Sequence, residues 1–264
     1  MSNPAFSVIV PVLNGEAHLE QCLNSIIDQA ETPELIIIDG GSKDATLDIV
    51  HNYNKHISYL ESGKDSGIAN AFNRGIMHAH GDIISILNSD DYWEADALEV
   101  IGKAAVHHPG KDIFIGNCRI HPENSKPYIK KPNLKAMKRY MSAYHPSTFV
   151  KRSAYEMIGP YNESYELAMD SDWIHRAIKM HASIHQVPHT LSNMRLGGIS
   201  DELSIKALRE YRQSVIDNDI APRFYANFFF WLHRTSKTLD KFNLARKLRK
   251  LINKTFNKTV EYPE

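Results

Sequence analysis

Four short apolar runs, rich in β-branched residues, recur through the first ninety residues, and segments with helical spacing separate them. A run of this length and composition predicts a strand that is buried within a sheet. The runs cover residues 6–12, 35–39, 57–61 and 83–87, and the helical segments lie near 19–27, 47–50 and 68–77. Strands that alternate with helices at this spacing predict βαβ crossovers. We therefore expect an α/β protein with a mostly parallel sheet flanked by helices.

The loops that follow these four runs carry most of the polar residues that could do chemistry. In a parallel sheet, ligands bind beyond the carboxyl ends of the strands. The four loops read PVLNGE, DGGS, SGKDSG and NSDD in chain order. None of them contains the G-x-G-x-x-G pattern of a dinucleotide site, which argues against a nicotinamide-dependent enzyme. The sequence thus predicts a site at this edge of the sheet for a different ligand.

Asp90 and Asp91 follow the fourth run directly. Adjacent carboxylates repel each other unless a positive charge relieves them, and a divalent cation is the obvious candidate. Hard oxygen ligands suit Mg²⁺ or Mn²⁺, which commonly bind one or two carboxylates together with substrate phosphates. The alternative for this pair is a solvated turn, or a cap for the helix expected near Glu94.

Two further loops hold candidate nucleotide contacts. Asp39 ends the second run beside Gly40 and Gly41, and glycines let a backbone come close to a ligand. Its carboxylate could accept hydrogen bonds from a nucleobase or ribose; the alternative is an ordinary turn aspartate. In the third loop and the helix after it, Lys64 and Arg74 offer cations for a diphosphate, and the alternative is a solvated helix face.

A second acidic segment, AMDSDWIHRA, places Asp170 and Asp172 on either side of Ser171 and just before Trp173. A carboxylate held near an apolar ring can have a raised pKa and can take a proton from a hydroxyl, as a general base must. Considered alone, the segment favours the alternative of acidic residues that stabilise a helix amino terminus. The G-x-S-x-G pattern of a serine hydrolase is absent.

Taken in order, these segments resemble family 2 glycosyltransferases with the GT-A fold. The resemblance covers about residues 6–200 and rests on the order of the motifs PVLNGEAHLEQCLNSIIDQ, IIIDGGSKDAT, GKDSGIANAFNRGIMHAHGD, ISILNSDDYW, HPSTFV, AMDSDWIHRA and RLGGIS. It implies a Rossmann-like GT-A domain. It also implies an inverting transfer of a hexosyl or N-acetylhexosaminyl group from a nucleotide-diphosphate sugar to an acceptor hydroxyl.

The resemblance also implies a role for individual residues, by their positions in these motifs. The matching positions are Pro11, Asn14 and Glu16 in the first nucleotide loop, Asp39 at the nucleobase, Asp65, Gly67 and Arg74 near the nucleotide and its diphosphate, Asp90 at the ribose, Asp91 at a divalent metal (Mn²⁺ or Mg²⁺), and Asp170 as the catalytic base. Uridine is the base that the family favours, and a guanosine donor stays open.

The sequence departs from the family pattern at three positions. Gly40 stands where many members have a second Asp, and Asn88 replaces the first Asp of a longer acidic triplet. Met169 replaces the Glu of a Glu-Asp pair. This last change leaves the choice of base open, with Asp172 as the second candidate after Asp170.

We expect residues 1–202 to form the glycosyltransferase domain, with a nucleotide-sugar half (about 1–112) and an acceptor half (about 113–202), and residues 203–264 to form a helical extension. Residues 223–258 contain ten Lys or Arg and only one acidic residue, Asp240, a balance of +9. The same segment holds a cluster of aromatic residues: Phe224, Tyr225, Phe228, Phe229, Phe230 and Trp231.

This basic and aromatic segment has two explanations of equal weight. It could form an interfacial helix on anionic lipid, which suits a polyprenyl-diphosphate-linked or glycan acceptor. It could equally form a helical hairpin that packs on the catalytic domain or on a second subunit. Nucleic acid is not an expected partner, because the overall net charge is zero and no nucleic-acid-binding module accompanies the basic segment.

Features of the whole chain favour a cytoplasmic protein, peripheral at most on the inner face of the membrane. The amino terminus has no basic leader and no apolar run reaches the length of a membrane span. Two cysteines without metal-like spacing favour a reducing compartment. The alternatives to polysaccharide or lipid-linked oligosaccharide synthesis are a nucleotidyltransferase that makes a nucleotide sugar, and a non-catalytic glycan- or membrane-binding homologue.

Overall fold

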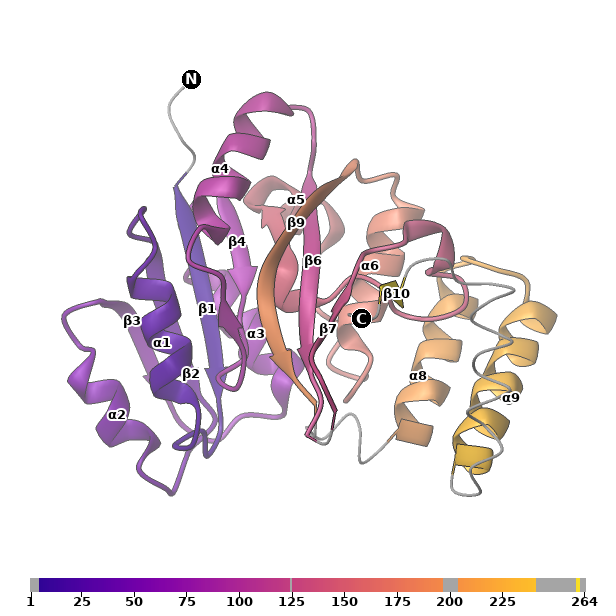
Figure 1. The fold of residues 1–264 in the computed structure, drawn as a ribbon, viewed down its shortest axis with the longest axis horizontal. Coiled ribbons are helices and arrows are strands. Elements are labelled where there is room, and N and C mark those ends of the chain that lie inside the picture. The colour runs from indigo at the N-terminus through magenta and orange to yellow at the C-terminus, as the bar shows by residue number, and fades with distance from the viewer. Residues whose placement is uncertain (1–4, 124, 197–203, 241–259, 262–264) are drawn as a thin grey trace.

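The computed structural model describes residues 5–123, 125–196, 204–240, 260 and 261. Ten strands form one sheet, and helices cover both of its faces (Figure 1). The four predicted strands are confirmed as β1 (Phe6–Val12), β2 (Glu34–Asp39), β3 (Ile57–Ser62) and β4 (Ile83–Ile86). They lie in the order β4-β1-β2-β3, and every neighbouring pair among them is parallel. The three predicted helices are α1 (Leu19–Ile27), α2 (Thr46–Asn52) and α3 (Ile68–Met77).

The second half of the sheet is mainly antiparallel, so the prediction of a mostly parallel sheet holds for the first half only. Its strands are β5 (Tyr92–Trp93), β6 (Ile113–His121), β7 (Tyr128–Lys130), β8 (Thr148–Lys151), β9 (Ile184–Arg195) and β10 (Val260–Glu261). β8 joins β4 to β6 through antiparallel pairing, and β9 runs parallel to β6 along its other edge. Short links such as the one from β6 to β7 permit only antiparallel neighbours. The α/β class itself is confirmed.

The remaining helices are α4 (Ala97–His107), α5 (Arg152–Ile158), α6 (Met169–Lys179), α8 (Ser204–Asp217) and α9 (Arg223–Asp240), with short 3₁₀ turns η1 (Leu134–Ala136) and η2 (His145–Ser147). α8 packs between α6 and α9. The strand β10 pairs with β7 at the sheet edge. The proposed boundary at residue 202 stays a prediction. Among the helices that the structure describes, none is both long enough and apolar enough to cross a bilayer.

Alternating residues of the parallel strands point to opposite faces of the sheet and contribute to two separate hydrophobic cores. On β1, Val8 and Val10 face a core that α1, α2 and α4 complete, whereas Ile9 faces a core that α3, α5 and α6 complete. A two-sided core explains why the parallel strands read as continuous apolar runs rather than as alternating ones. Because both faces are closed by helices, the polar loops at the ends of the strands are where the sheet is open to a ligand.

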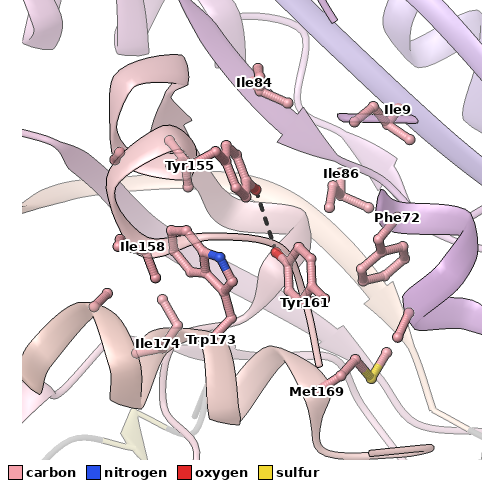
Figure 2. Packing of buried hydrophobic residues seen from close by; sticks show 14 of the residues in the cluster. Ile9, Phe72, Ile84, Ile86, Tyr155, Ile158, Tyr161, Met169, Trp173 and Ile174 are labelled. Atoms are coloured by element: carbon pink, nitrogen blue, oxygen red, sulfur yellow. Dashed lines mark hydrogen bonds between the residues drawn. The ribbon is translucent and has the colours of Figure 1, made fainter. Parts of the chain in front are cut away.

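A cluster of aromatic side chains fixes α6 against the second of these cores (Figure 2). The ring centroids of Tyr155 and Trp173 lie 4.8 Å apart, and Tyr161 meets Phe72 of α3 edge to face at 5.2 Å. The indole Nε1 of Trp173 donates to the carbonyl of Gly159 at 2.9 Å. These contacts hold the first turn of α6 in one position.

Candidate active site

The loops after β1 and β2 are joined by hydrogen bonds. The amide of Asn14 donates to Ser42 Oγ at 2.8 Å, and Asn14 Oδ1 accepts from the amide of Lys43 at 2.9 Å. Glu16 Oε2 accepts from the amide of Ala45, also at 2.9 Å. Asn14 has a positive φ of 51°, a conformation that Asn adopts more readily than most residues. The described bonds of Asn14 and Glu16 therefore shape the loops.

Pro11, the other residue predicted for this loop, lies within β1 opposite Ile38 of β2. The loop after β1 also reaches the acidic loop after β4, since a Cβ placed on Gly15 would lie 3.1 Å from Ser89 Oγ. The loops after β1, β2 and β4 thus form one continuous surface at the carboxyl edge of the parallel strands.

Asp39 lies fully buried at the end of β2. Its carboxylate accepts from the amides of Gly41 and Ser42 at 3.1 Å and from Ser62 Oγ at 2.6 Å. These bonds connect the second loop to the end of β3. A Cβ on Gly40 would lie 2.9 Å from Asp65 Oδ2, so the glycine at this position lets the second and third loops touch. A direct contact of Asp39 with a nucleobase stays a prediction.

The third loop leads into α3 through Asp65 and Gly67. Asp65 Oδ1 accepts from the amide of Gly67 at 3.0 Å, and Gly67 has a φ of 126°, which favours glycine. Arg74, near the end of α3, forms an ion pair with Glu61 of β3 at 2.7 Å. The ion pair of Arg74 therefore ties α3 to β3 next to the third loop, and its contact with a diphosphate stays a prediction.

Arg195, to which the sequence analysis assigned no role, is the cation that contacts the acidic pair. Its amide donates to Asp91 Oδ1 at 3.2 Å, and its guanidinium donates to the carbonyl of Asp90 and to Gln21 Oε1. The guanidinium also lies 5.2 Å from the ring centre of Tyr92. Pairing of β5 with β9 brings these residues together across 104 positions of sequence. In the sequence, the only indication that Arg195 belongs to the site was its position at the start of the RLGGIS motif.

Asp91 is 2% exposed, and burial together with the neighbouring charge of Asp90 raises its pKa well above the ordinary value, against the opposing effect of Arg195. Close by in sequence, Asn88 Oδ1 is buried and has no hydrogen-bond partner within the described chain. Two acidic side chains and an unsatisfied acceptor form an environment that a cation would satisfy.

The described residues contain no group of three His, Cys, Asp or Glu that could hold a metal alone. Mg²⁺ and Mn²⁺ do not require such a group, because they commonly take one or two carboxylates and fill the remaining positions with substrate phosphates and water. Asp91 and Asp90 thus fit a divalent ion that binds together with a diphosphate.

Asp170 lies in the first turn of α6 and lines a small cavity of about 10 Å³, which has room for about one water molecule. Burial raises the pKa of Asp170 to about 6, and its Oδ1 accepts from the amide of Ser171 at 2.6 Å. Ile86, the last residue of β4, lines the same cavity. The cavity therefore touches the end of β4, and Asp91 follows Ile86 five residues later in the sequence.

Asp172, the second candidate base, is engaged inside the protein. It is 3% exposed and pairs with Arg176 at 3.0 Å. Asn218 Nδ2 and Ser214 Oγ of the α8 region donate to it at 3.0 and 3.3 Å. Met169, which stands in place of the family Glu, is buried in the apolar core (Figure 2). Of the two aspartates, Asp170 is the one that lines the cavity.

Comparisons with known proteins agree with this architecture. The sequence profile described as Glycosyl transferase family 2 matches residues 7–159. The chain is 30% identical over 210 residues to a PGL/p-HBAD biosynthesis glycosyltransferase of Mycobacterium tuberculosis, a match that covers 77% of this chain and 82% of the relative.

Solved structures share the fold at low sequence identity. The mannosyltransferase PcManGT of Pyrobaculum calidifontis, in complex with GDP-Man and Mn²⁺, superposes with a TM-score of 0.67 at 18% identity, over 87% of this chain and 70% of that one. TarS residues 1–349 of S. aureus, in complex with UDP-GlcNAc, gives a TM-score of 0.62 at 18% identity, over 86% and 70%. The profile match and the curated relative confirm what the ordered motifs predicted: the chain belongs to glycosyl transferase family 2 and is a glycosyltransferase of the GT-A fold.

Proposed function

We propose that the protein is an inverting glycosyltransferase that moves a sugar from a UDP-sugar to an acceptor hydroxyl, with a divalent metal at Asp91 and Asp170 as the base. The observation that carries this proposal is a pair of acidic sites with raised pKa values: Asp91, beside Asp90 in the loop after β4, and Asp170, which lines a small cavity that Ile86 at the end of β4 also lines. An acidic metal site and a separate base are the two parts that such a transfer needs.

The donor half of the site follows from the strand-end loops. Asp91 would hold the metal and Asp90 the ribose. The residues that would surround the nucleotide lie at the strand ends, in the loops after them and on α3, namely Pro11, Asn14, Glu16, Asp39, Asp65, Gly67 and Arg74. When bound, the metal would supply positive charge against the leaving diphosphate. The guanidinium of Arg195, already bonded to the Asp90 carbonyl, adds a second positive charge at this edge.

The acceptor half depends on Asp170. With a pKa of about 6, its carboxylate is mostly ionised at neutral pH yet basic enough to take a proton from a sugar hydroxyl. Attack of that hydroxyl on the anomeric carbon, from the face opposite the leaving diphosphate, inverts the configuration.

The choice of uridine is tested by titration calorimetry with UDP, GDP, CDP and dTDP, each with and without Mn²⁺. We expect UDP to bind only in the presence of the metal, because the phosphates complete the coordination that the two carboxylates begin. Both solved relatives described above hold a nucleotide sugar, one with uridine and one with guanosine. Tight binding of GDP instead of UDP would agree with a sugar-transfer reaction but would make the donor a GDP-sugar. No binding by folded protein would contradict the proposed donor site.

We propose further that the acceptor is a glycan or a lipid-linked oligosaccharide, and that residues 223–258 contact a membrane surface. The aromatic residues of α9 divide between two faces. Phe229 and Phe230 are 8% exposed and pack inward, whereas Phe224, Phe228 and Trp231 are 75%, 60% and 55% exposed. The exposed three follow at intervals of four and three residues, so they share one face of the helix. An outward aromatic stripe next to a basic segment is the composition of an interfacial helix. Most of the basic residues that give residues 223–258 a charge of +9 lie at 241–258, outside the described part of the chain.

Vesicle sedimentation tests this contact. Replacing Phe224, Phe228 and Trp231 together with Ser is expected to lower binding to anionic vesicles by about tenfold or more, since each apolar group inserted in the interface contributes to affinity. The matched control replaces Met77 and Met180, exposed side chains of α3 and of the end of α6, with Ser. Equal sedimentation of the aromatic variant and the wild type, or no preference of the wild type for anionic over neutral lipid, would contradict the membrane contact.

A further inference from the structure

The helix that carries Asp170 begins without a capping side chain of its own. Ala168 precedes α6, and its methyl group cannot accept a hydrogen bond from the first turn. Helices usually begin at Ser, Thr, Asp or Asn, whose side-chain oxygen fixes the entry of the chain into the helix. The aromatic cluster holds α6 only from the side of the core, so the start of this helix depends on a further contact from elsewhere in the chain.

Glu210 of α8 supplies such a contact. Its Oε2 accepts from the amide of Leu167 at 2.8 Å and from the amide of Ala168 at 3.0 Å. Hydrogen bonds to an ionised carboxylate are roughly twice as strong as neutral ones, and a negative charge near a helix amino terminus interacts favourably with the helix dipole. These amides lie just before Asp170 in the chain, so Glu210 fixes the backbone that leads into the turn of the base.

Further contacts join α8 to α6 along the length of both helices. Asn218 Nδ2 donates to Asp172 Oδ1 at 3.0 Å, and Asp219, just after α8, pairs with Lys179 at the end of α6 at 2.8 Å. The partners in these contacts, and in those of Glu210, are 40 to 46 positions apart in sequence, so the contacts follow the two helices in the same order. α8 therefore supports the whole of α6, and Glu210 is its contact at the start.

The pKa of Asp170 depends on how firmly this turn is held. Burial raises the pKa of Asp170 to about 6, and the hydrogen bonds from Ser171 act against that rise. Burial also lowers the pKa of His145, which lines the same cavity, to about 4, so this ring is neutral at pH 7. Charged side chains of α6, α8 and the adjoining loops form pairs of their own, namely Asp172 with Arg176, Glu166 with Lys206 and Lys179 with Asp219. A turn that moved toward water would rehydrate the Asp170 carboxylate, and its pKa would fall toward the ordinary value.

We propose that Glu210 is a positioning residue for the transfer reaction: by holding the amides of Leu167 and Ala168, its carboxylate keeps Asp170 at the place where a base meets the acceptor hydroxyl. The inference rests on the proposed function and gives a role to α8, which lies outside the profile match at residues 7–159. Glu210 itself takes no proton from the acceptor; it acts through the backbone.

Two variants separate the hydrogen bonds of Glu210 from its charge. Glu210→Gln removes the charge and keeps an oxygen that can accept from the two amides, whereas Glu210→Ala removes both. Transfer from UDP-glucose and UDP-N-acetylglucosamine to octyl glycosides gives kcat and the donor KM from about pH 4.5 to 8, and calorimetry gives the Kd for UDP with Mn²⁺. The matched control is Glu166→Ala, since Glu166 precedes Leu167 and also pairs with α8, but its described partner is the side chain of Lys206.

We expect Glu210→Ala to lower kcat by about 10- to 100-fold, because a small displacement of a catalytic group has an effect of this size, and to leave the Kd for UDP unchanged. The inflection of kcat with pH should move from about 6 to lower pH by about one unit, as Asp170 gains contact with water. Glu210→Gln should keep kcat within about threefold of the wild type, since its hydrogen bonds are neutral rather than charged. Both variants lose the negative charge, so the difference between their inflections measures the effect of the hydrogen bonds. Glu166→Ala should match the wild type.

A lower Tm for Glu210→Ala with kcat and inflection unchanged would overturn the proposal and make Glu210 a structural residue. Equal losses of kcat in Glu210→Ala and Glu210→Gln would also overturn it, because the hydrogen bonds to the amides would then have no effect on the base.

Failure of the proposed function is recognised separately. If the wild type transfers no sugar from any nucleotide sugar, the transferase reaction itself is wrong, and if Asp170→Asn is as active as the wild type, the base is wrong. Hydrogen exchange at the amides of Leu167 and Ala168 does not depend on activity. Exchange that is faster in Glu210→Ala than in Glu210→Gln shows that Glu210 holds these amides, and equal exchange contradicts the proposal whatever the reaction is.

Discussion

Replacing Asp170 with Asn is expected to lower kcat for sugar transfer by about 10²- to 10⁴-fold, the usual contribution of a general base. Asn has nearly the same shape and keeps an oxygen for the amide of Ser171, but it cannot take a proton. Binding of UDP and metal should be unchanged, because the acidic pair beyond β4 is untouched. Initial rates and calorimetry on the same preparation measure both quantities.

The pH dependence gives the same prediction a second readout. The base works only when ionised, so log kcat of the wild type should rise with pH at a slope near one below the Asp170 pKa of about 6 and should level off above it. The residual rate of Asp170→Asn should lack this rise. A wild-type rate that falls as pH increases from 5 to 7 would contradict the assignment.

Asp172→Asn is the matched control, since it changes the same kind of group two residues away. Asp172 pairs with Arg176 and ties α6 to the α8 region through Asn218. Removing its charge leaves a partly buried guanidinium without its partner, which is destabilising. The expected result is a lower Tm with kcat reduced far less than in Asp170→Asn. The reverse pattern would make Asp172 the base.

The parallel half of the fold could be predicted from the sequence because its information is local. Each strand from β1 to β4 is a continuous apolar run, and each intervening helix has its own spacing of apolar residues. The second half could not be predicted in this way. The sheet continues from β4 through β8 to β6, and Ile113 of β6 pairs with Ile184 of β9 far along the chain. No local pattern encodes which of these distant strands pair, so the antiparallel pairs of β8 with β4 and β6 were not expected.

In the candidate site, too, the residues in local motifs could be predicted and the long-range contacts could not. The acidic pair and Asp170 were identified by motif; the structure places the pair in the loop after β4 and Asp170 in the first turn of α6, and their roles stay predictions. Arg195 was missed because its contact with Asp91 depends on the pairing of β5 with β9. The ion pair of Arg74 with Glu61 was also not expected, since both residues are charged and nothing in the sequence says that they meet. Long-range contacts of polar side chains were the part that sequence reasoning could not reach.

Replacing Asp91 with Asn is expected to abolish metal-dependent nucleotide binding, with the Kd for UDP in Mn²⁺ weakened by about 100-fold or more. Even residues that only support a metal ligand contribute 10- to 100-fold to affinity, and Asp91 is proposed as a ligand. Transfer activity should fall with it, since the leaving diphosphate loses its main positive partner. Asp48→Asn, on the exposed face of α2, is the control and should behave as the wild type.

Thermal unfolding distinguishes loss of a ligand from loss of the fold. Burial and Asp90 raise the pKa of Asp91, so ionising this carboxylate in the folded protein without metal costs stability. Without metal, Asp91→Asn should therefore keep or raise the Tm. Adding Mn²⁺ and UDP should raise the Tm of the wild type in proportion to the logarithm of ligand concentration, and should leave the variant unchanged. The contradicting outcome is that Asp91→Asn has a lower Tm without metal and still binds nucleotide only when Mn²⁺ is present. Asp91 would then be a turn residue, and the metal would bind through other groups.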